Sequence, residues 1–130
     1  MKRRVALQSI LTAGAFSAAA DAVTMGTIQL HTDLEVKLDA EKQLLADFEK
    51  LFLPRIKKAP GFIDAKLLKF RKANIGTTPE RYNYRLVQTF ASEELREQWT
   101  TNPDHKIAWH TAIERHVKTP FIAYLFEMKS

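Results

Sequence analysis

The sequence predicts an α+β fold whose elements follow one another in the order β-α-β-β-α-β. Strand-like segments place apolar residues at every second position, whereas two longer segments repeat them at every third or fourth position. Clusters of Pro, Gly, Asn and Thr separate these segments.

The chain of 130 residues contains no cysteine, which excludes disulfides, thiolate metal sites and a cysteine nucleophile. A single hydrophobic core must therefore hold the fold together.

The amino-terminal half is expected to form a strand and a helix. Residues 27–36 alternate, so that one face is mainly apolar and the other is polar: Ile28, Leu30, Thr32, Leu34 and Val36 against Gln29, His31, Asp33 and Glu35. Asp39 is the expected N-cap of the helix, with Glu41 in its first turn. Apolar residues then recur at helical spacing for about five turns, at Leu44, Leu45, Phe48, Leu51, Phe52 and Ile56. Pro54 is expected to kink this helix.

The central part is predicted to contain two neighbouring strands joined by a loop. Residues 62–70 form the less regular strand. Residues 71–81 contain the turn-forming residues Asn74, Gly76, Thr77, Thr78 and Pro79. Residues 82–90 alternate again, which places five residues on one face of the next strand: Tyr82, Tyr84, Leu86, Gln88 and Phe90.

The carboxy-terminal part is predicted to hold an interrupted helix and a last strand. Ser92 is the expected N-cap of the helix, and acidic residues follow it directly. Asn102 is expected to cap a second helical stretch that has Pro103 at its first position and runs to about Val117. Residues 121–128 are strongly apolar and form the predicted closing strand.

This order of elements is that of the ferredoxin-like split βαβ arrangement, in which both helices cover the same face of one sheet. Apolar residues fall on both faces of the predicted strands, at Leu30, Leu34, Leu68, Leu86 and Phe126. The face away from the helices must therefore be covered as well. A second copy that packs its sheet against this one is the expected cover, so the sequence predicts a homodimer.

Residues 1–22 have the features of a signal peptide. A basic start is followed by an apolar, small-residue run and by Ala20-Asp21-Ala22, a pattern that signal peptidases cleave. We expect a periplasmic or secreted protein with one mature domain at residues 23–130, and Arg3-Arg4 is suggestive of the twin-arginine route. Cleavage removes three basic residues and one acidic residue, which lowers the formal charge from +5 to +3. So small a charge predicts no nucleic-acid partner, and the diluted apolar run predicts no stable membrane span after processing.

Five short motifs lie within residues 27–128: Pro60-Gly61-Phe62, Lys66-Leu67-Leu68, Tyr84-Arg85-Leu86-Val87, Ser92-Glu93-Glu94-Leu95-Arg96-Glu97-Gln98-Trp99 and Pro103-Asp104-His105. Together with the broken second helix, they resemble the antibiotic biosynthesis monooxygenase domain. The resemblance implies a dimeric α/β barrel with a pocket between helices and sheet in each protomer. It also implies that dioxygen oxidises a quinol-like or other small aromatic substrate without metal or flavin, so no cofactor is expected. The family further includes heme-degrading proteins and proteins with no known activity.

Cofactor-free oxygenation needs a base that deprotonates the substrate and a donor that stabilises the anion. The expected catalytic residues are His31, His105 or His110 as the base and Arg85 as the anion donor. The expected ligand-binding residues are Trp99, Tyr84, Asn83 and Trp109, and Asn83 is the alternative donor. Structural roles stay open for the histidines, a core position for Trp99 and a solvent-facing position for Arg85. No pair among His105, His110 and His116 has the i, i+4 spacing of a helical metal site, so no metal is predicted.

The ligand pocket is expected between the second helix and the sheet. The Asn102-Pro103 break is expected to leave backbone groups unpaired and to open space beside Trp99. Two alternatives to an oxygenase stay open: a non-catalytic ligand-binding or stress-related barrel, and a heme-binding or heme-degrading protein. In the heme-degrading branch a tryptophan that distorts the porphyrin matches Trp99, and the iron-ligating histidine matches His110 only with a one-residue shift. Thr32 stands where that branch has an asparagine.

Overall fold

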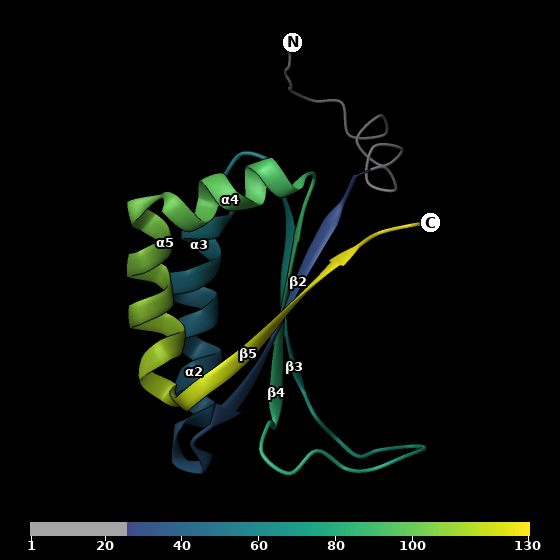
Figure 1. Ribbon diagram of the computed structural model, residues 1–130. Helices are drawn as coiled ribbons and strands as arrows, with labels where there is room; N and C mark the ends of the chain where they lie inside the picture. Colours follow the sequence, from purple (N-terminus) through teal and green to yellow (C-terminus); the bar gives the residue numbers. More distant parts are fainter. Residues whose placement is uncertain (1–25) are drawn as a thin grey trace.

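The computed structural model describes residues 26–130. Four strands form one antiparallel sheet in the order β3-β4-β2-β5 (Figure 1), namely β2 Ile28–Val36, β3 Phe62–Lys69, β4 Tyr84–Phe90 and β5 Val117–Glu127. The predicted element order and the α+β, ferredoxin-like class are confirmed. The predicted signal peptide, residues 1–22, lies outside the described residues and stays a prediction.

The helical segments all lie on one side of the sheet (Figure 1). They are η1 Leu38–Ala40, α2 Glu41–Asp47, η2 Phe48–Phe52 and α3 Leu53–Ile56 between the first two strands, and α4 Glu93–Thr101, α5 Pro103–Ala108, η3 Trp109–Ile113 and η4 Glu114–His116 before the last. No helix within residues 26–130 is long and apolar enough to cross a membrane.

The prolines at positions 54 and 103 both lie where the regular helical hydrogen bonding changes. Pro54 lies at the start of α3, directly after the π-helical turn η2. Proline has no N–H to donate, and the wider π turn accommodates the missing hydrogen bond. The break at Asn102 is confirmed, because the Asn102 side chain accepts a hydrogen bond from the Asp104 N–H at 2.8 Å.

Three predicted element ends were wrong. Asp39 makes no capping hydrogen bond and lies inside the short turn η1. The closing strand begins at Val117 rather than at residue 121, since Val117 pairs with Val36 at the end of β2. This start is compatible with Pro120 because β5 is an edge strand. The strand β4 begins at Tyr84, two residues later than predicted.

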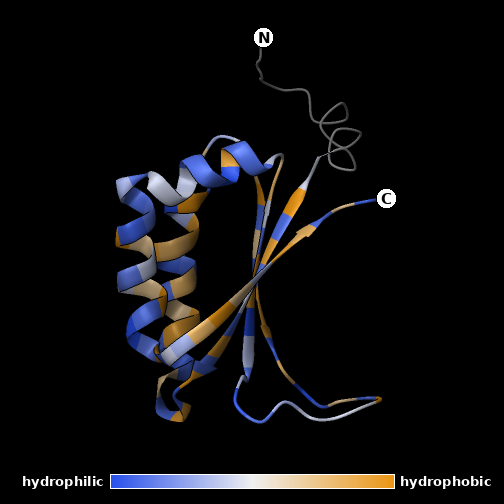
Figure 2. Cartoon of the chain, in the orientation of Figure 1, coloured by the Kyte–Doolittle hydropathy of each residue, from blue (hydrophilic) through white to orange (hydrophobic). Residues whose placement is uncertain are grey.

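The hydrophobic core lies between the sheet and the helices. The predicted helix-facing rows of β2 and β4 supply Leu34, Val36, Tyr84, Leu86 and Phe90, and the helices supply Leu44, Phe48, Phe52, Ile56, Trp99, Ala108, Ala112 and Ile113. Hydrophobic colour accordingly marks the strands and the sheet-facing sides of the helices (Figure 2). Burial of these side chains supplies most of the driving force for folding.

The opposite side of the sheet, here called the open face, is not covered by any helix of the described chain. The strand register aligns Leu68, Arg85, Asp33 and Ile122 in one row across it, and Lys66, Val87, His31 and Tyr124 in the next. Leu68, Ile122, Tyr124 and Phe126 are each between 38% and 49% exposed. The prediction that both faces of the sheet carry apolar residues is therefore confirmed.

A buried carboxylate joins the first helical segment to the start of β5. The Asp47 Oδ2 lies 2.7 Å from His116 Nε2 and 2.5 Å from Arg115 Nη2, and the Asp47 Oδ1 accepts a hydrogen bond from Gln43 Nε2 at 2.8 Å. Burial alone raises the pKa of the Asp47 carboxyl, but the hydrogen bonds from His116, Arg115 and Gln43 reverse this and lower it to about 2. The ionised carboxylate is therefore the form that the folded protein binds.

Replacement of Asp47 by Asn should lower the free energy of unfolding by about 2 kcal/mol at pH 7, because the buried partners lose a charged acceptor. The pKa of the Asp47 carboxyl in the folded protein, about 2, lies below the ordinary value of 3.8 that it has in the unfolded chain. The stabilisation is therefore complete above pH 3.8 and is lost as the pH falls through about 2. Urea unfolding of wild type and Asp47→Asn across this range measures the difference. Asp39→Asn, at an exposed carboxylate, is the control, and a pH-independent difference at position 47 would contradict the assignment.

Candidate functional site

The eight predicted site residues do not gather in one place. His31 and Arg85 lie on the open face, whereas Trp99 and His105 belong to the helical layer. The other four lie elsewhere: Asn83 and Tyr84 at the start of β4, and Trp109 and His110 in η3.

His31 lies in the middle of the open face. Its Nε2 is 3.0 Å from the Gln29 Oε1, and its ring packs edge-to-face on Phe126 with centroids 4.7 Å apart. Its Nδ1 is buried and has no hydrogen-bond partner within the described chain. Burial lowers the pKa of His31, the charge of Arg85 lowers it further, and Asp33 opposes both effects. The neutral imidazole is therefore favoured.

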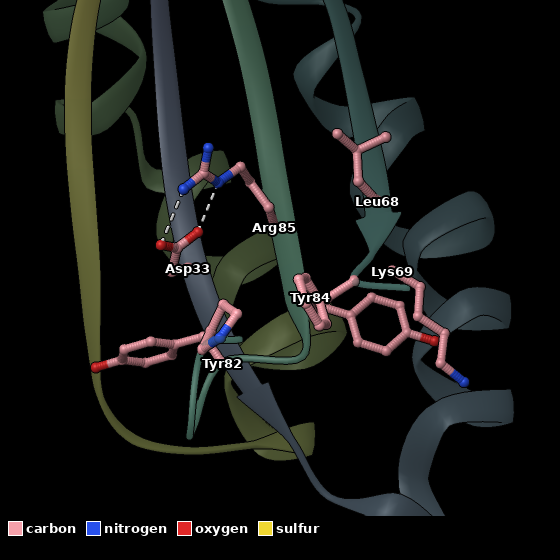
Figure 3. A pocket seen from close by; sticks show the side chains of 8 residues that line it. Asp33, Leu68, Lys69, Tyr82, Tyr84 and Arg85 are labelled. Atoms are coloured by element: carbon pink, nitrogen blue, oxygen red, sulfur yellow. Dashed lines mark hydrogen bonds and ion pairs between the residues drawn. The ribbon is translucent and has the colours of Figure 1, made fainter. Parts of the chain in front are cut away.

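Arg85 is held by Asp33 on the neighbouring strand. Its Nε and Nη2 donate to the two Asp33 oxygens at 2.6 and 3.1 Å (Figure 3). Arg85 and Asp33 thus form a bidentate ion pair. The pair borders a hollow of about 380 Å³, whose other lining residues are Leu68, Lys69, Phe70, Pro79, Tyr82 and Tyr84. Because Asp33 neutralises its charge, Arg85 is poorly suited to stabilise a substrate anion.

Asn83 and Tyr84 have structural partners. The Asn83 side chain accepts from the Val36 N–H at 2.7 Å and donates to the Val36 carbonyl at 3.0 Å, so it ties the start of β4 to the end of β2. Tyr84 belongs to the buried core, and burial, followed by the charge of Glu41, raises the pKa of its hydroxyl. Asn83 is therefore not free to act as an anion donor, and the Tyr84 ring, predicted to bind the ligand, packs in the core.

His110 and Trp109 lie on the outer helical turn. The His110 side chain is 75% exposed, and its Nδ1 lies 2.9 Å from the Glu114 Oε1. Trp109 is half-buried against Phe121, with ring centroids 5.1 Å apart. Both residues border a shallow hollow of about 340 Å³. His110 thus lies at the surface, whereas Trp99 lies in the core.

Trp99 and His105 lie on either side of the helix break and contact each other. Their rings meet edge-to-face with centroids 5.3 Å apart. Trp99 is only 3% exposed, yet its indole Nε1 has no hydrogen-bond partner in the part of the chain that the structure describes. Burial lowers the pKa of His105, and the charge of Arg96 lowers it further. A neutral proton acceptor therefore lies beside an unused N–H donor.

The helix break that positions this pair is fully capped. The Asn102 N–H donates to the Trp99 carbonyl at 3.0 Å, and the Asn102 carbonyl accepts from the His105 N–H at 2.9 Å. The expectation that the break leaves backbone groups unpaired was wrong, because the Asn102 backbone and side chain satisfy them.

Arg96 is a residue that the sequence reasoning missed. Its Nε and Nη2 donate to the two Glu93 oxygens at 2.7 Å each, and its side chain is largely buried. The i, i+3 spacing of Glu93 and Arg96 could have indicated this pair. The position of Arg96 near His105 depends on the packing of α4 against α5, which the spacing does not contain.

The described residues contain no cluster of three or more His, Asp or Glu side chains that could hold a metal ion. The chemistry that the Trp99–His105 pair can perform is proton acceptance by a neutral imidazole and donation from an indole N–H.

No family model matches the sequence, and no curated protein matches it. Solved structures do match. SnoaB, a cofactor-independent oxygenase from Streptomyces nogalater, has a TM-score of 0.59 at 15% identity, over 78% of this chain and 91% of its own. A dimeric ferredoxin-like protein of unknown function from Jannaschia sp. CCS1 gives 0.63 at 15% identity, over 78% and 99%. The heme degrader MhuD from Mycobacterium tuberculosis, with two hemes bound, gives 0.57 at 22% identity, over 77% and 93%.

The fold is ferredoxin-like. It is the fold that the resemblance to antibiotic biosynthesis monooxygenases implies, and the similarity extends over nearly the whole length of each matched protein. The ferredoxin-like frame therefore places the Trp99–His105 pair in the helical layer and the His31–Arg85 group on the other side of the sheet.

Replacement of Arg96 by Gln should raise the pKa of His105. Arg96 disfavours the protonated imidazole, so its removal, which also leaves Glu93 unpaired, favours that form. An NMR titration of the imidazole protons in wild type should give a midpoint below the ordinary 6.5 for His105, and the variant should titrate at higher pH. Arg71→Gln, at an exposed loop position, is the control and should leave the midpoint unchanged. Equal midpoints in wild type and Arg96→Gln would contradict the assignment.

Proposed function

We propose that the chain is a member of the antibiotic biosynthesis monooxygenase family that oxidises a small aromatic or quinol-like compound with dioxygen, at a site beside Trp99 and His105. The observation that carries the proposal is the buried, unpartnered Nε1 of Trp99 next to the partly buried imidazole of His105. Buried polar groups are nearly always hydrogen-bonded, and a role in binding or catalysis is one explanation for an exception.

In this reaction His105 removes a proton from an acidic C–H or O–H group of the substrate. The Trp99 N–H donates a hydrogen bond to the resulting enolate or phenolate oxygen. The anion transfers an electron to dioxygen, recombination of the two radicals gives a peroxide anion, and protonated His105 returns its proton to form the hydroperoxide. For a CH2 group beside an aromatic ketone, loss of water from this hydroperoxide leaves a carbonyl. One oxygen atom of dioxygen stays in the product and the other leaves as water.

Comparison with known structures supports an oxygenase, because SnoaB combines this fold with cofactor-independent oxygenation. Of the three histidines considered, His105 best fits the base, since burial keeps it neutral next to an aromatic wall. His31 lies on the open face, and His110 is paired with Glu114 at the surface. A non-catalytic ligand-binding barrel is the alternative, and it differs from the oxygenase by the absence of turnover.

Oxygen uptake by the purified protein with a quinol and with an anthrone tests this activity. His105→Gln should lower kcat by about 10²-fold or more, because general-base catalysis is lost. Trp99→Phe keeps an aromatic ring but removes the N–H and part of the indole, so it should lower kcat by about tenfold or more and destabilise the core less than Trp99→Ala does. Ligand binding without oxygen uptake in wild type would favour the non-catalytic barrel.

His110→Gln is the matched control for the histidine, and it should retain wild-type turnover. Trp99→Ala separates packing from function, because loss of a buried tryptophan costs about 3–5 kcal/mol of stability whether or not a ligand binds. Urea unfolding of each variant shows whether a loss of activity comes from lost folding stability or from lost function. A Soret spectrum of a defined complex after addition of hemin, together with no oxygen uptake, would replace the oxygenase by a heme protein.

The proposal includes a homodimer joined through the open faces of two sheets. Four half-exposed apolar residues and the buried, unpartnered Nδ1 of His31 lie on this face. The matched protein from Jannaschia is dimeric and has the same fold. A small domain with an apolar sheet face in water gains stability when a second copy covers that face.

Light scattering and sedimentation at micromolar concentration should show a dimer. Tyr124→Asp places a charge on the open face next to β2, and burial of an unpaired carboxylate should weaken the dimer by about 3 kcal/mol, roughly 100-fold. Leu38→Asp is the control, because Leu38 is 84% exposed and precedes α2 on the helical side. A wild-type monomer at this concentration would refute the proposed dimer.

A further inference from the structure

The loop between β3 and β4, residues 70–83, is here called the arm. It extends away from the sheet on the side opposite to the helices, which is the side of the open face (Figure 1). No backbone hydrogen bond in the described chain involves residues 71–82. A connection of this length without secondary structure is uncommon in a compact domain, and functional loops are one of the two classes in which it is usually found.

The base of the arm is firmly held. The Phe70 N–H donates to the Asn83 carbonyl at 2.8 Å, and the Asn83 N–H donates to the Leu34 carbonyl at 3.0 Å. The Arg81 guanidinium lies 5.3 Å from the Tyr82 ring centroid, and its Nε lies 3.3 Å from the Glu35 Oε1. Because these contacts fix both ends of the arm to β2 and β4, the direction in which it leaves the sheet is set by the fold.

The outer part of the arm carries an apolar residue that no other part of residues 26–130 covers. Ile75 is 92% exposed and precedes Gly76, whose φ of +95° gives a turn that residues with a side chain rarely adopt. The next most exposed large apolar residue, Leu38 at 84%, lies on the helical side. Burial of this exposed isoleucine side chain against another surface would lower the free energy, because apolar area is removed from water.

We infer that the arm reaches over a second copy of this chain, so that Ile75 packs on the partner when the two open faces meet. The inference rests on the proposed dimer. A second copy of this chain is the expected partner, because the arm and the apolar open face lie on the same side of the sheet. In such a pair each protomer contributes one arm, and contact is made outside the sheet-to-sheet interface itself. The hollow between the arm and the open face, bordered by Pro79, Tyr82 and Leu68, lies at the edge of the same surface.

Sedimentation analysis of the purified protein as a function of concentration tests the arm. Ile75→Ser removes the apolar contact, and since two arms act in each dimer, the dissociation constant should rise at least tenfold. Leu38→Ser is the matched control and should leave it unchanged. Urea unfolding at concentrations where wild type and both variants are monomeric should agree, because neither side chain belongs to the core.

Cross-linking gives a second readout that does not depend on affinity. The natural chain has no cysteine, so Ile75→Cys can be labelled specifically with a benzophenone maleimide. Irradiation should give a covalent dimer, and peptide mapping should place the cross-link on the partner. Leu38→Cys, labelled in the same way, should give none.

The outcomes separate the arm from the dimer as a whole. A wild-type monomer would overturn both. A wild-type dimer with an unchanged dissociation constant for Ile75→Ser, and no cross-linked dimer from position 75, would overturn the arm and leave the sheet-to-sheet dimer in place. Binding to phosphatidylglycerol–phosphatidylcholine vesicles that Ile75→Ser abolishes, with dimerisation unchanged, would overturn it in favour of a membrane contact.

Discussion

One-sided covering of the sheet is the constraint on which the rest of this structure depends. The helical segments bury one set of alternating residues, and residues 26–130 supply no second layer for the other set. A domain of this size buries only a modest fraction of its surface when it folds alone. The apolar residues on β3 and β5 therefore stay partly exposed, and the fold presents a surface that favours association.

The polar residues on the open face are arranged in a way that makes covering them less costly. Arg85 and Asp33 neutralise each other through two hydrogen bonds, and Gln29 contacts both His31 and Thr89. Burial of charged groups is expensive unless they are paired and hydrogen-bonded. Since these pairs already exist within one protomer, contact with a second sheet requires little further rearrangement of the face.

On the helical side, the candidate site and the core share residues. Trp99 packs in the core, and the capped break at Asn102 lets α5 turn so that His105 meets the indole ring. The core position gives the ring its rigidity, whereas the unpartnered N–H is a cost to stability that a purely structural residue would avoid. Local costs of this kind often occur at functional sites, where the surrounding structure compensates for them.

The sequence by itself determined the fold class, the alternation of the strands and the caps at Ser92 and Asn102. These features depend on neighbours within a few positions, so periodicity and residue type are enough to predict them. The prediction that both sheet faces are apolar followed from apolar residues in the less regular strand and in the closing strand, such as Leu68 and Phe126. The start of β5 did not follow from such local patterns, because it depends on pairing with Val36, which is distant in the sequence.

Only the tertiary structure decided which candidate residues lie together. It separated His31 and Arg85 from Trp99 and His105 by a sheet, because the first pair lies on the open face and the second pair lies on the helices. It also assigned Asn83 to the end of β2 and joined Asp47 to His116, two residues 69 positions apart. Such contacts depend on how the helices and strands pack against one another. The local spacing and type of residues do not reveal this packing.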